Sequence, residues 1–393
     1  MRIIKSHAPI LILVIAAFYA FEYYEQLPLS ILYGFVFIPV LLAMLVVGLS
    51  AHFNRSRVFF YALLIAIVNM TLGLRWMESA LSYAMFTAMI PIQLLILVLL
   101  PERGIFSARA APAYLSMILL AGLVMFTALS TPPWATHLLL NDWLPARYFD
   151  WSRLSQSVLG INLLTALTLL VLCFVRPSLQ MTAALGIWLM LITQLQMGHT
   201  SSSLNVFSSA ALLMCLYAIT HESWRMAYLD ELTGLPARRA LRERFQQISG
   251  LYTVAMLDVD HFKKFNDTYG HDTGDAVLQM IAARMQKVTG GGQPFRYGGE
   301  EFTVLFKGKS AKDSKEHLDN LRETIASTPF IIHRGSRRKG DSRDKTRNKK
   351  SVQVTVSIGM ADSNSKAAPW DVLKLADKAL YRAKKKGRNC VCE

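Results

Sequence analysis

The stretch that decides the fold of the C-terminal part is Phe295-Arg296-Tyr297-Gly298-Gly299-Glu300-Glu301-Phe302-Thr303-Val304-Leu305-Phe306. Its two apolar segments flank a pair of glycines, which is typical of a β-hairpin with a tight turn. Glycine lets the backbone turn sharply there, and it lets a phosphate approach the main chain closely. Two glutamates follow the glycines directly, so the hairpin presents two carboxylates at its turn.

Helices and strands alternate around this hairpin. The periodicity predicts helices over 236–247, 262–268, 275–288, 312–327 and 370–385, and strands over 252–259, 295–297, 301–306 and 353–358. This alternation predicts an α/β or α+β domain of about 165 residues, with an antiparallel-containing central sheet flanked by helices.

Three acidic positions suggest a site for chemistry. Asp258 ends the strand predicted over 252–259, and Glu300 and Glu301 lie at the hairpin turn. Carboxylates at the ends of neighbouring strands can converge on magnesium, which prefers oxygen ligands and substrate phosphates. Metal ions held in this way would stabilise the attacking and leaving oxygens of a phosphoryl transfer. Taken alone, the same residues also fit an ordinary hairpin with solvated acids.

Further blocks, in order along the chain, favour the chemical interpretation. They are Asp230-Glu231-Leu232-Thr233-Gly234-Leu235, Asp258-Val259-Asp260-His261-Phe262-Lys263-Lys264-Phe265-Asn266-Asp267, Tyr269-Gly270-His271, Gly274-Asp275, Val356-Ser357-Ile358-Gly359, Ala376-Asp377-Lys378-Ala379-Leu380-Tyr381-Arg382-Ala383-Lys384 and Gly387-Arg388-Asn389. With the Gly-Gly-Glu-Glu-Phe turn, these blocks make the chain from about Asp230 to Asn389 resemble the GGDEF-domain family, the diguanylate cyclases. The resemblance implies a fold like that of nucleotidyl cyclases and polymerase palms. It also implies a homodimer in which two GTP molecules become cyclic di-GMP and two pyrophosphates.

The resemblance implies a metal site and catalytic residues. Asp258, the backbone carbonyl of Val259 and Glu300 match the metal ligands, and Glu301 supports the metal site. Two Mg²⁺ ions per active site are implied, and Mn²⁺ can take their place. Glu300 also matches the base for the 3′-hydroxyl, and Lys263 matches a phosphate contact that stabilises the transition state.

Other positions match substrate contacts. Asp275 with its partner Asn266 matches the guanine-reading pair. A carboxylate can accept from guanine N1–H and the exocyclic amine, whereas adenine offers an acceptor at N1, so Asp275 favours GTP over ATP. His271 matches a neighbour of the substrate, although packing or capping of its loop explains it equally well. The remaining predicted substrate contacts are Lys384, Arg388, Gly298 and Gly299.

The chain departs from the family pattern at three places. Glu300 stands where the family name has Asp, and Ala237 stands where Asn is common after Leu-Pro. The stretch 289–292 reads Thr-Gly-Gly-Gly, without the Arg and Asp of the family's product-inhibition motif. We therefore expect no feedback inhibition through that position.

Residues 1–220 have the composition of a membrane domain. They carry 10 Lys+Arg and 6 Asp+Glu, against 32 and 21 in residues 221–393. Apolar runs long enough to span a bilayer predict eight transmembrane helices, with Pro39 kinking the second. A cleaved signal peptide is the alternative for the first run, but no small-residue cleavage site follows it. The predicted runs are 8–24, 29–49, 58–74, 80–100, 111–129, 158–175, 181–197 and 204–219.

Arginines and lysines between these runs predict the orientation. Inside segments would hold Arg2, Lys5, Arg55, Arg57, Arg103, Arg109, Arg176 and Arg225, and outside loops Arg75, Arg147 and Arg153. This bias places the N-terminus and the GGDEF-like domain in the cytoplasm. The predicted location is the bacterial inner membrane, with the lipid bilayer as a partner.

The expected layout is a membrane domain over 1–220 that is a possible sensor, a short helical linker over 221–229 and a catalytic domain over 230–393. Segment 333–350 carries nine Lys+Arg against two Asp, so we expect a loop between strands. Contact of this loop with anionic lipid is one hypothesis. Nucleic-acid binding is not expected, because no aromatic residues lie between the charges. Two alternatives to an active, membrane-controlled enzyme are a catalytically inactive signalling or GTP-binding module and a transporter with a regulatory domain.

Overall fold

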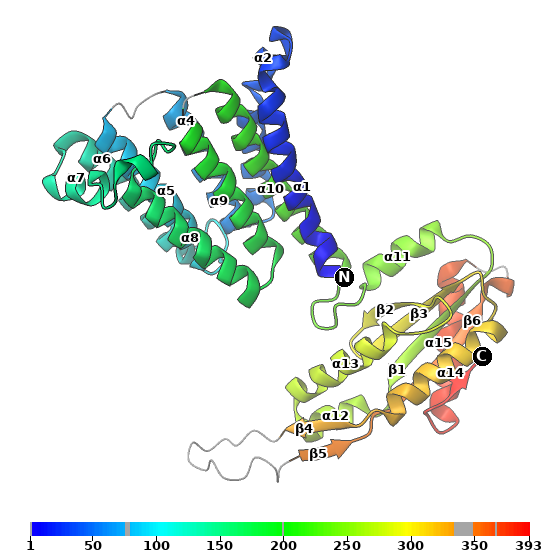
Figure 1. The fold of residues 1–393 in the computed structure, drawn as a ribbon. Helices are drawn as coiled ribbons and strands as arrows, with labels where there is room; N and C mark the ends of the chain where they lie inside the picture. The colour runs from blue at the N-terminus through cyan, green and yellow to red at the C-terminus, as the bar shows by residue number, and fades with distance from the viewer. Residues whose placement is uncertain (1, 75–78, 199, 334–348, 366–367) are drawn as a thin grey trace, which may run out of the picture. The chain divides into compact units, whose positions relative to one another are not determined.

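The computed structural model describes residues 2–74, 79–198, 200–333, 349–365 and 368–393. The chain forms two compact units, Met1–Ser223 and Trp224–Glu393. The first is built from helices, and the second mixes helices with a five-stranded sheet (Figure 1). The predicted fold class, an all-helical membrane-type region followed by an α/β domain with a largely antiparallel sheet, is confirmed.

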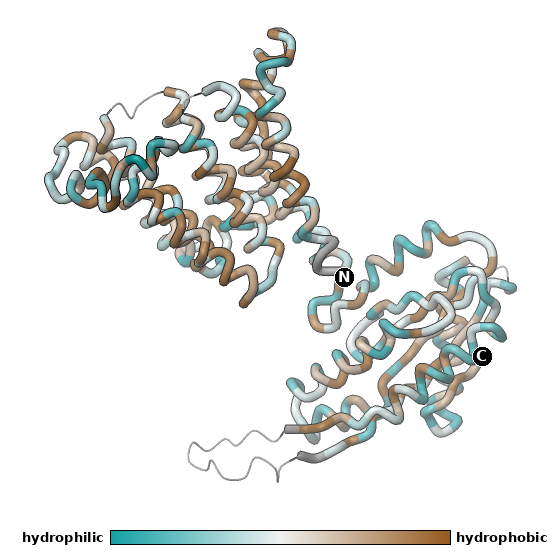
Figure 2. The backbone as a smooth tube through the Cα atoms, in the orientation of Figure 1, coloured by the Kyte–Doolittle hydropathy of each residue, from teal (hydrophilic) through white to brown (hydrophobic). Residues whose placement is uncertain are grey.

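Among the described residues of the first unit, eight stretches are long and apolar enough to cross a membrane, which indicates a multi-pass membrane protein. Apolar residues run along these helices (Figure 2). The longer helices are α1 (Arg2–Tyr23), α3 (Ile38–His52), α4 (Ser56–Gly73), α5 (Ala80–Leu99), α6 (Ala111–Ser130), α8 (Gln156–Val175), α9 (Leu179–Met197) and α10 (Ser201–Tyr228), and the short ones are α2 (Leu29–Phe35) and α7 (Pro133–Leu140).

The second stretch differs from the single kinked helix that the sequence predicts. It is interrupted after α2, and α3 begins at Ile38, with Pro39 in its first turn. Proline is tolerated in the first turn because the N–H that it lacks would have no partner inside the helix. Pro39 therefore begins a new helix and does not kink a continuous one.

The second unit is built around a sheet with the strand order β2-β3-β1-β6-β7. All neighbours pair antiparallel except β6 and β7, which are parallel. The elements of this unit are α11 (Arg238–Gln247), β1 (Tyr252–Val259), α12 (Phe262–Tyr269), α13 (His271–Met285), β2 (Gln293–Gly298), β3 (Glu301–Lys307), α14 (Ala311–Ser327), β4 (Phe330–His333), β5 (Lys349–Val352), β6 (Val356–Asp362), α15 (Pro369–Lys385) and β7 (Val391–Cys392).

Most predicted elements are present, with shifted ends in three places. The helix predicted from Pro236 begins at Arg238, because Pro236 and Leu229 form a β-bridge before it. The helix predicted from Asp275 begins four residues earlier, at His271. The strand predicted over 353–358 lies at Val356–Asp362. The basic segment predicted as a loop is flanked by the antiparallel pair β4 and β5, and residues 334–348 lie outside the described residues.

Two apolar clusters cover the two faces of the sheet. Ala255 and Leu257 of β1 point to one cluster, which includes residues of α12, α13 and α14. Val254 and Met256 point to the other, which includes residues of α11 and α15. Successive side chains of a strand point to opposite faces, so β1 contributes to both clusters and is buried along its whole length. Residues 224–393 thus have an apolar core of their own.

Helix α15 packs directly on β6 at Gly359. A Cβ atom at this position would overlap backbone atoms of Ala376, Ala379 and Leu380. Backbone atoms of a packed helix cannot move aside as a flexible side chain can, so only glycine lets the helix lie this close to the strand. This contact also fixes the distance between α15 and the sheet, and the last turn of α15 carries Lys384.

We predict that Gly359→Ala lowers the free energy of unfolding of the fragment 224–393 by about 3 kcal/mol, because overpacking forces α15 away from β6. Urea denaturation followed by circular dichroism measures the change. Gly299→Ala is the control, since a Cβ there meets nothing within 4 Å. Equal stabilities of the Gly359→Ala fragment and the parent would contradict the packing described here.

Candidate active site

The C-terminal end of β1 brings the predicted acidic residues together. Asp258 lies opposite Glu301 of β3 on one side and opposite Ser357 of β6 on the other. Its side chain is buried, with 6% of the residue exposed. Glu300 belongs to the turn just before β3 and is close enough for the charge of Asp258 to affect its pKa. Antiparallel pairing therefore gathers these three carboxylates, although Glu300 and Glu301 lie 42 and 43 residues after Asp258 in the sequence.

A lysine of α15 lies among these carboxylates. The Nζ atom of Lys384 is 2.8 Å from Oδ1 of Asp258. Burial raises the pKa of Asp258, and the ion pair with Lys384 offsets only part of that rise. Burial and the charge of Asp258 raise the pKa of Glu300 as well. The protein by itself therefore disfavours the ionised forms of the two acids, and a cation beside them would stabilise those forms.

The donor atoms fit a magnesium ion that is shared with a substrate. The described residues contain no group of three or more His, Cys, Asp or Glu side chains placed to hold a metal alone. Magnesium is usually bound by one or two carboxylates, with waters and substrate phosphates completing its octahedron. Asp258 and Glu300 can supply the carboxylates, and Val259, the last residue of β1, can supply a carbonyl oxygen.

Two residues hold the glycine turn, and sequence analysis gave neither of them a role. Arg296 donates from Nη2 to the carbonyl oxygen of Gly299 at 2.8 Å, and its Nη1 lies 2.7 Å from Oδ1 of Asp230. Asp230 also accepts bonds from the main chain and hydroxyl of Thr233. The register of β2 against β3 is irregular between Arg296 and Gly298. An arginine two residues before a Gly-Gly turn is the sequence signal for this contact, but its acidic partner is 66 residues away.

Asp260 is a fourth acid near the site, and its carboxylate is hydrogen-bonded inside the protein. It accepts hydrogen bonds from Thr355 Oγ1 at 2.7 Å and Ser357 Oγ at 2.6 Å. It also accepts from the main-chain N–H of Asn389 at 3.1 Å. Asp260 therefore fixes the segment after α15 to the end of β1.

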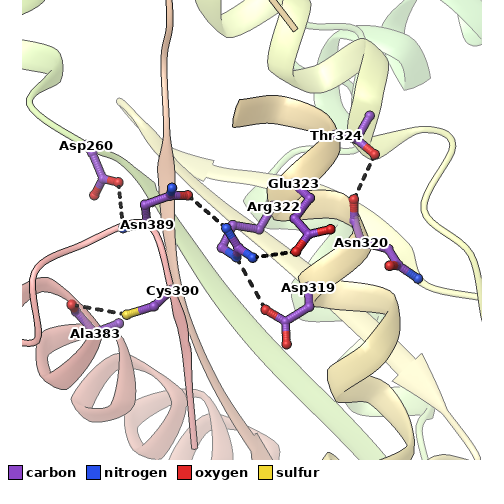
Figure 3. A network of polar contacts seen from close by, with 9 residues as sticks. All are labelled: Asp260, Asp319, Asn320, Arg322, Glu323, Thr324, Ala383, Asn389 and Cys390. Carbon is purple, nitrogen blue, oxygen red and sulfur yellow. Dashed lines mark hydrogen bonds and ion pairs between the residues drawn. The ribbon is translucent and has the colours of Figure 1, made fainter. Parts of the chain in front are cut away.

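The same segment is held from its other side by α14 (Figure 3). Arg322 Nη1 donates to Oδ1 of Asn389 at 3.2 Å, and Asp319 and Glu323 pair with the rest of that guanidinium. Arg388 itself has a backbone φ of 66°, a left-handed conformation that this anchoring stabilises. Its charge lowers the pKa of Asp258, which places Arg388 as well as Lys384 close to that carboxylate.

The predicted guanine-reading pair lies between α12 and α13. Asn266 of α12 packs against Gly274 of α13, where a Cβ atom would overlap the Asn266 side chain. Oδ1 of Asn266 is buried and has no hydrogen-bond partner among the described residues. Asp275, the next residue after Gly274, is exposed, as is His271 at the start of α13. Lys263, in the first turn of α12, is also exposed, and no described contact joins it to the acidic cluster.

These features define a site at which carboxylates and a lysine meet at the end of the central strand, and comparison with known proteins gives the family of the domain. Residues 227–390 match the family model described as "Diguanylate cyclase, GGDEF domain". Residues 227–390 are thus a domain of the GGDEF diguanylate cyclase family.

Individual relatives match over the same part of the chain. Diguanylate cyclase DgcP of Pseudomonas aeruginosa is 38% identical over 171 residues, 42% of this chain and 23% of that protein. Response regulator PleD of Caulobacter vibrioides is 34% identical over 178 residues, 43% of this chain and 36% of that protein. The match thus spans well under half of either relative. A crystal structure of the coiled coil and GGDEF domain of DgcB from Caulobacter crescentus, in complex with c-di-GMP, is 29% identical with a TM-score of 0.39, over 44% of this chain and 88% of that one.

The Asp230–Arg296 contact predicts a pH-dependent stability. Burial alone would raise the pKa of Asp230, but the bonds from Thr233 and Arg296 outweigh burial and lower it. An acid with a lowered pKa in the folded state stabilises the protein above its unfolded pKa of about 3.9, and this contribution is lost as the pH falls through the lowered value. We predict that Asp230→Asn destabilises the fragment 224–393 by about 2 kcal/mol at pH 7.

Urea denaturation at pH 7, 5 and 3 checks this prediction. The gap between Asp230→Asn and the parent should persist from pH 7 to 5 and shrink toward pH 3. Glu231→Gln, which changes an exposed neighbour, should leave stability unchanged at each pH. A gap of the same size at pH 3 and pH 7 would show that the charge of Asp230 has no part in the effect.

Proposed function

We propose that this chain is a diguanylate cyclase that condenses two GTP molecules into cyclic di-GMP and two pyrophosphates. The observation that carries the proposal is the buried Asp258 carboxylate beside Glu300, with Lys384 ion-paired to it. A family domain that had lost its activity would have no reason to keep two carboxylates whose ionised forms are this poorly stabilised by the protein itself.

The acidic cluster is proposed to bind Mg²⁺ with the phosphates of GTP, with Mn²⁺ as a substitute. Asp258, Glu300 and the carbonyl of Val259 are the proposed ligands, and Glu301 supports them. When bound, the ions lower the pKa of the 3′-hydroxyl and neutralise charge on the phosphates.

Glu300 is the proposed acceptor of the 3′-hydroxyl proton. Its raised pKa makes it a better base near neutral pH than an ordinary glutamate. As the 3′-oxygen forms its bond to the α-phosphorus, the bond from that phosphorus to the bridging oxygen breaks and pyrophosphate leaves. Lys263, Lys384 and Arg388 are proposed to contact the phosphates and stabilise this charge. Gly298 and Gly299 leave room for the phosphates at the turn.

The proposed guanine contacts are Asn266 and Asp275. Oδ1 of Asn266 is a buried acceptor that lacks a donor, and the guanine amine is a donor of the kind it needs. The exposed carboxylate of Asp275 would accept from guanine N1–H. His271, at the mouth of the same pair of helices, is a proposed neighbour of the substrate.

Catalysis is proposed to need a homodimer. Each GTP must supply one 3′-hydroxyl and one α-phosphate to the other, so two loaded domains have to face each other.

Residues 1–220 are proposed to anchor the enzyme in the inner membrane and to set its activity through the linker 221–229. The catalytic domain 230–393 and the N-terminus are proposed to lie in the cytoplasm, where GTP is found. Segment 333–350 remains a candidate for contact with anionic lipid. The alternative is a GGDEF module that binds GTP or a partner without turnover.

Incubation of the detergent-solubilised chain with GTP and Mg²⁺ should yield cyclic di-GMP, detected by mass spectrometry. We predict that Asp258→Asn and Glu300→Gln each lower kcat at least about a hundredfold, because each removes charge that acts on the reacting phosphates. Glu316→Gln, an exposed acid on α14, is the matched control and should keep full activity. A folded dimeric wild-type chain that binds GTP but makes no cyclic di-GMP would favour the inactive module.

Nucleotide selectivity gives a separate prediction for Asp275. Asp275→Asn should lower kcat/KM for GTP by about ten- to a hundredfold, the loss expected for one good bidentate base contact. The residual rate with ATP should stay unchanged, because adenine cannot donate from N1. Parallel rates with both nucleotides measure the ratio. An unchanged GTP/ATP preference would remove Asp275 from the proposed guanine site.

A further inference from the structure

A small cavity of about 170 Å³ lies at one end of the helical unit. It is enclosed by the first turn of α4, the end of α5 and the first turn of α6. Its charged lining consists of Arg57, Arg103, Arg109 and Glu102, and Phe60 and Leu97 are among its apolar lining. The cavity is at the end of the bundle where α10 carries Glu222, six residues before that helix ends.

Among the described residues, no acidic side chain forms an ion pair with the three guanidinium groups around this cavity. Arg57 donates from Nη2 to the carbonyl of Leu100 at 2.8 Å and from Nη1 to Gln180, and both acceptors are uncharged. Its Nε–H is shielded from solvent and has no acceptor among the described residues. Arg103 and Arg109 are exposed, and the described part of the chain offers neither side chain an ion pair.

Glu102 is the acidic residue in the lining, and its carboxylate is already engaged. Oε1 accepts from the main-chain N–H of Arg57 at 3.4 Å, and Oε2 accepts from Nε2 of Gln180 at 3.3 Å. One carboxylate against three guanidinium groups leaves the lining with a net charge of +2. A negatively charged ligand would therefore be attracted into this cavity.

The N-terminus of α6 adds to this positive field. Helix α6 begins at the cavity without a side-chain cap or an acidic residue in its first turn, whereas the Arg57 N–H at the start of α4 is already bonded to Glu102. The N–H groups at the start of a helix act as about half a positive charge and readily bind phosphate.

We propose that this cavity binds the phosphate group of an anionic membrane phospholipid. Arginine binds phosphate through paired N–H donors, and a cavity of this size admits a phosphate but not a nucleotide. The cavity lies at the end of membrane-spanning helices, which is the depth of the lipid headgroups. Phe60, Leu97 and Ala113 offer apolar surface where the acyl chains would begin.

The cavity is also connected to the helix that leaves the bundle. Gln180 accepts from Arg57 and donates to Oε2 of Glu222 at 2.6 Å. Glu222 is further paired with Arg55 at 3.8 Å. A phosphate on Arg57 would therefore alter the hydrogen bonds that hold α10 at this end, so the lipid would act on the segment leading out of the bundle.

The experiment is a lipid titration of the full-length chain in a neutral detergent, followed by native mass spectrometry. Dioleoylphosphatidylglycerol should bind at least about tenfold more tightly than dioleoylphosphatidylcholine, because each arginine near an anionic headgroup contributes about fivefold in affinity. Arg103→Gln with Arg109→Gln should remove this preference. Both side chains lack partners in the described structure, so the double variant should fold like the wild type.

Arg176→Gln with Arg225→Gln is the matched control, since it removes the same charge from exposed residues outside the cavity. It should keep the preference for phosphatidylglycerol. Glycerol 3-phosphate, a soluble phosphate monoester, forms a second arm. If it does not compete with the lipid, the occupant is a lipid. Competition at micromolar concentration would show that the occupant is a soluble phosphate and not a lipid. Equal binding of the two lipids by the wild-type chain, or equal losses in the two double variants, would overturn the proposal.

Discussion

The backbone pairing of β1 with β3 on one side and β6 on the other is the constraint on which the site depends. It is the central strand of the sheet, and it is buried on both faces from Tyr252 to Val259. Register in such a strand cannot slip by one residue without turning apolar side chains to the wrong face. Asp258 is therefore held opposite Glu301 by the same forces that pack the core, and a buried carboxylate persists because the strand cannot move it to water.

The same pairing explains how much of the site sequence analysis could predict. Asp258, Glu300 and Glu301 were predicted as a cluster because the ends of neighbouring strands must lie close together, and the structure brings them together. Lys384 and Arg388 were assigned through the family resemblance; α15 places Lys384 near that cluster, and the segment after α15 places Arg388 there. The contact between Gly359 and α15, which sets the height of that helix, has no signal in a single sequence. It depends on the separation of two packed elements and not on the preference of any one residue.

The roles of Arg296, Asp230 and Asp260 were not predicted for a related reason. Each side chain makes bonds to partners far away in the sequence, such as Asn389 for Asp260 and Asp230 for Arg296. Sequence analysis gave these three residues no role, because short motifs contain no information on which charges the fold itself uses. Asp260 shows the distinction. Its three hydrogen bonds join it to other parts of the fold, whereas Asp258, two residues earlier, pairs with the side chain of Lys384.

Arg296 also takes part in a series of hydrogen bonds between the end of α10 and the glycine turn. The last residue of α10, Tyr228, accepts a hydrogen bond from the main-chain N–H of Ala237. The carbonyl of the preceding Pro236 accepts from the main chain of Arg296, whose side chain holds Gly299. From the end of α10 to the turn that carries Glu300, each step is therefore a hydrogen bond or a rigid peptide. Helix α10 itself runs without a break from Ser201 to Tyr228.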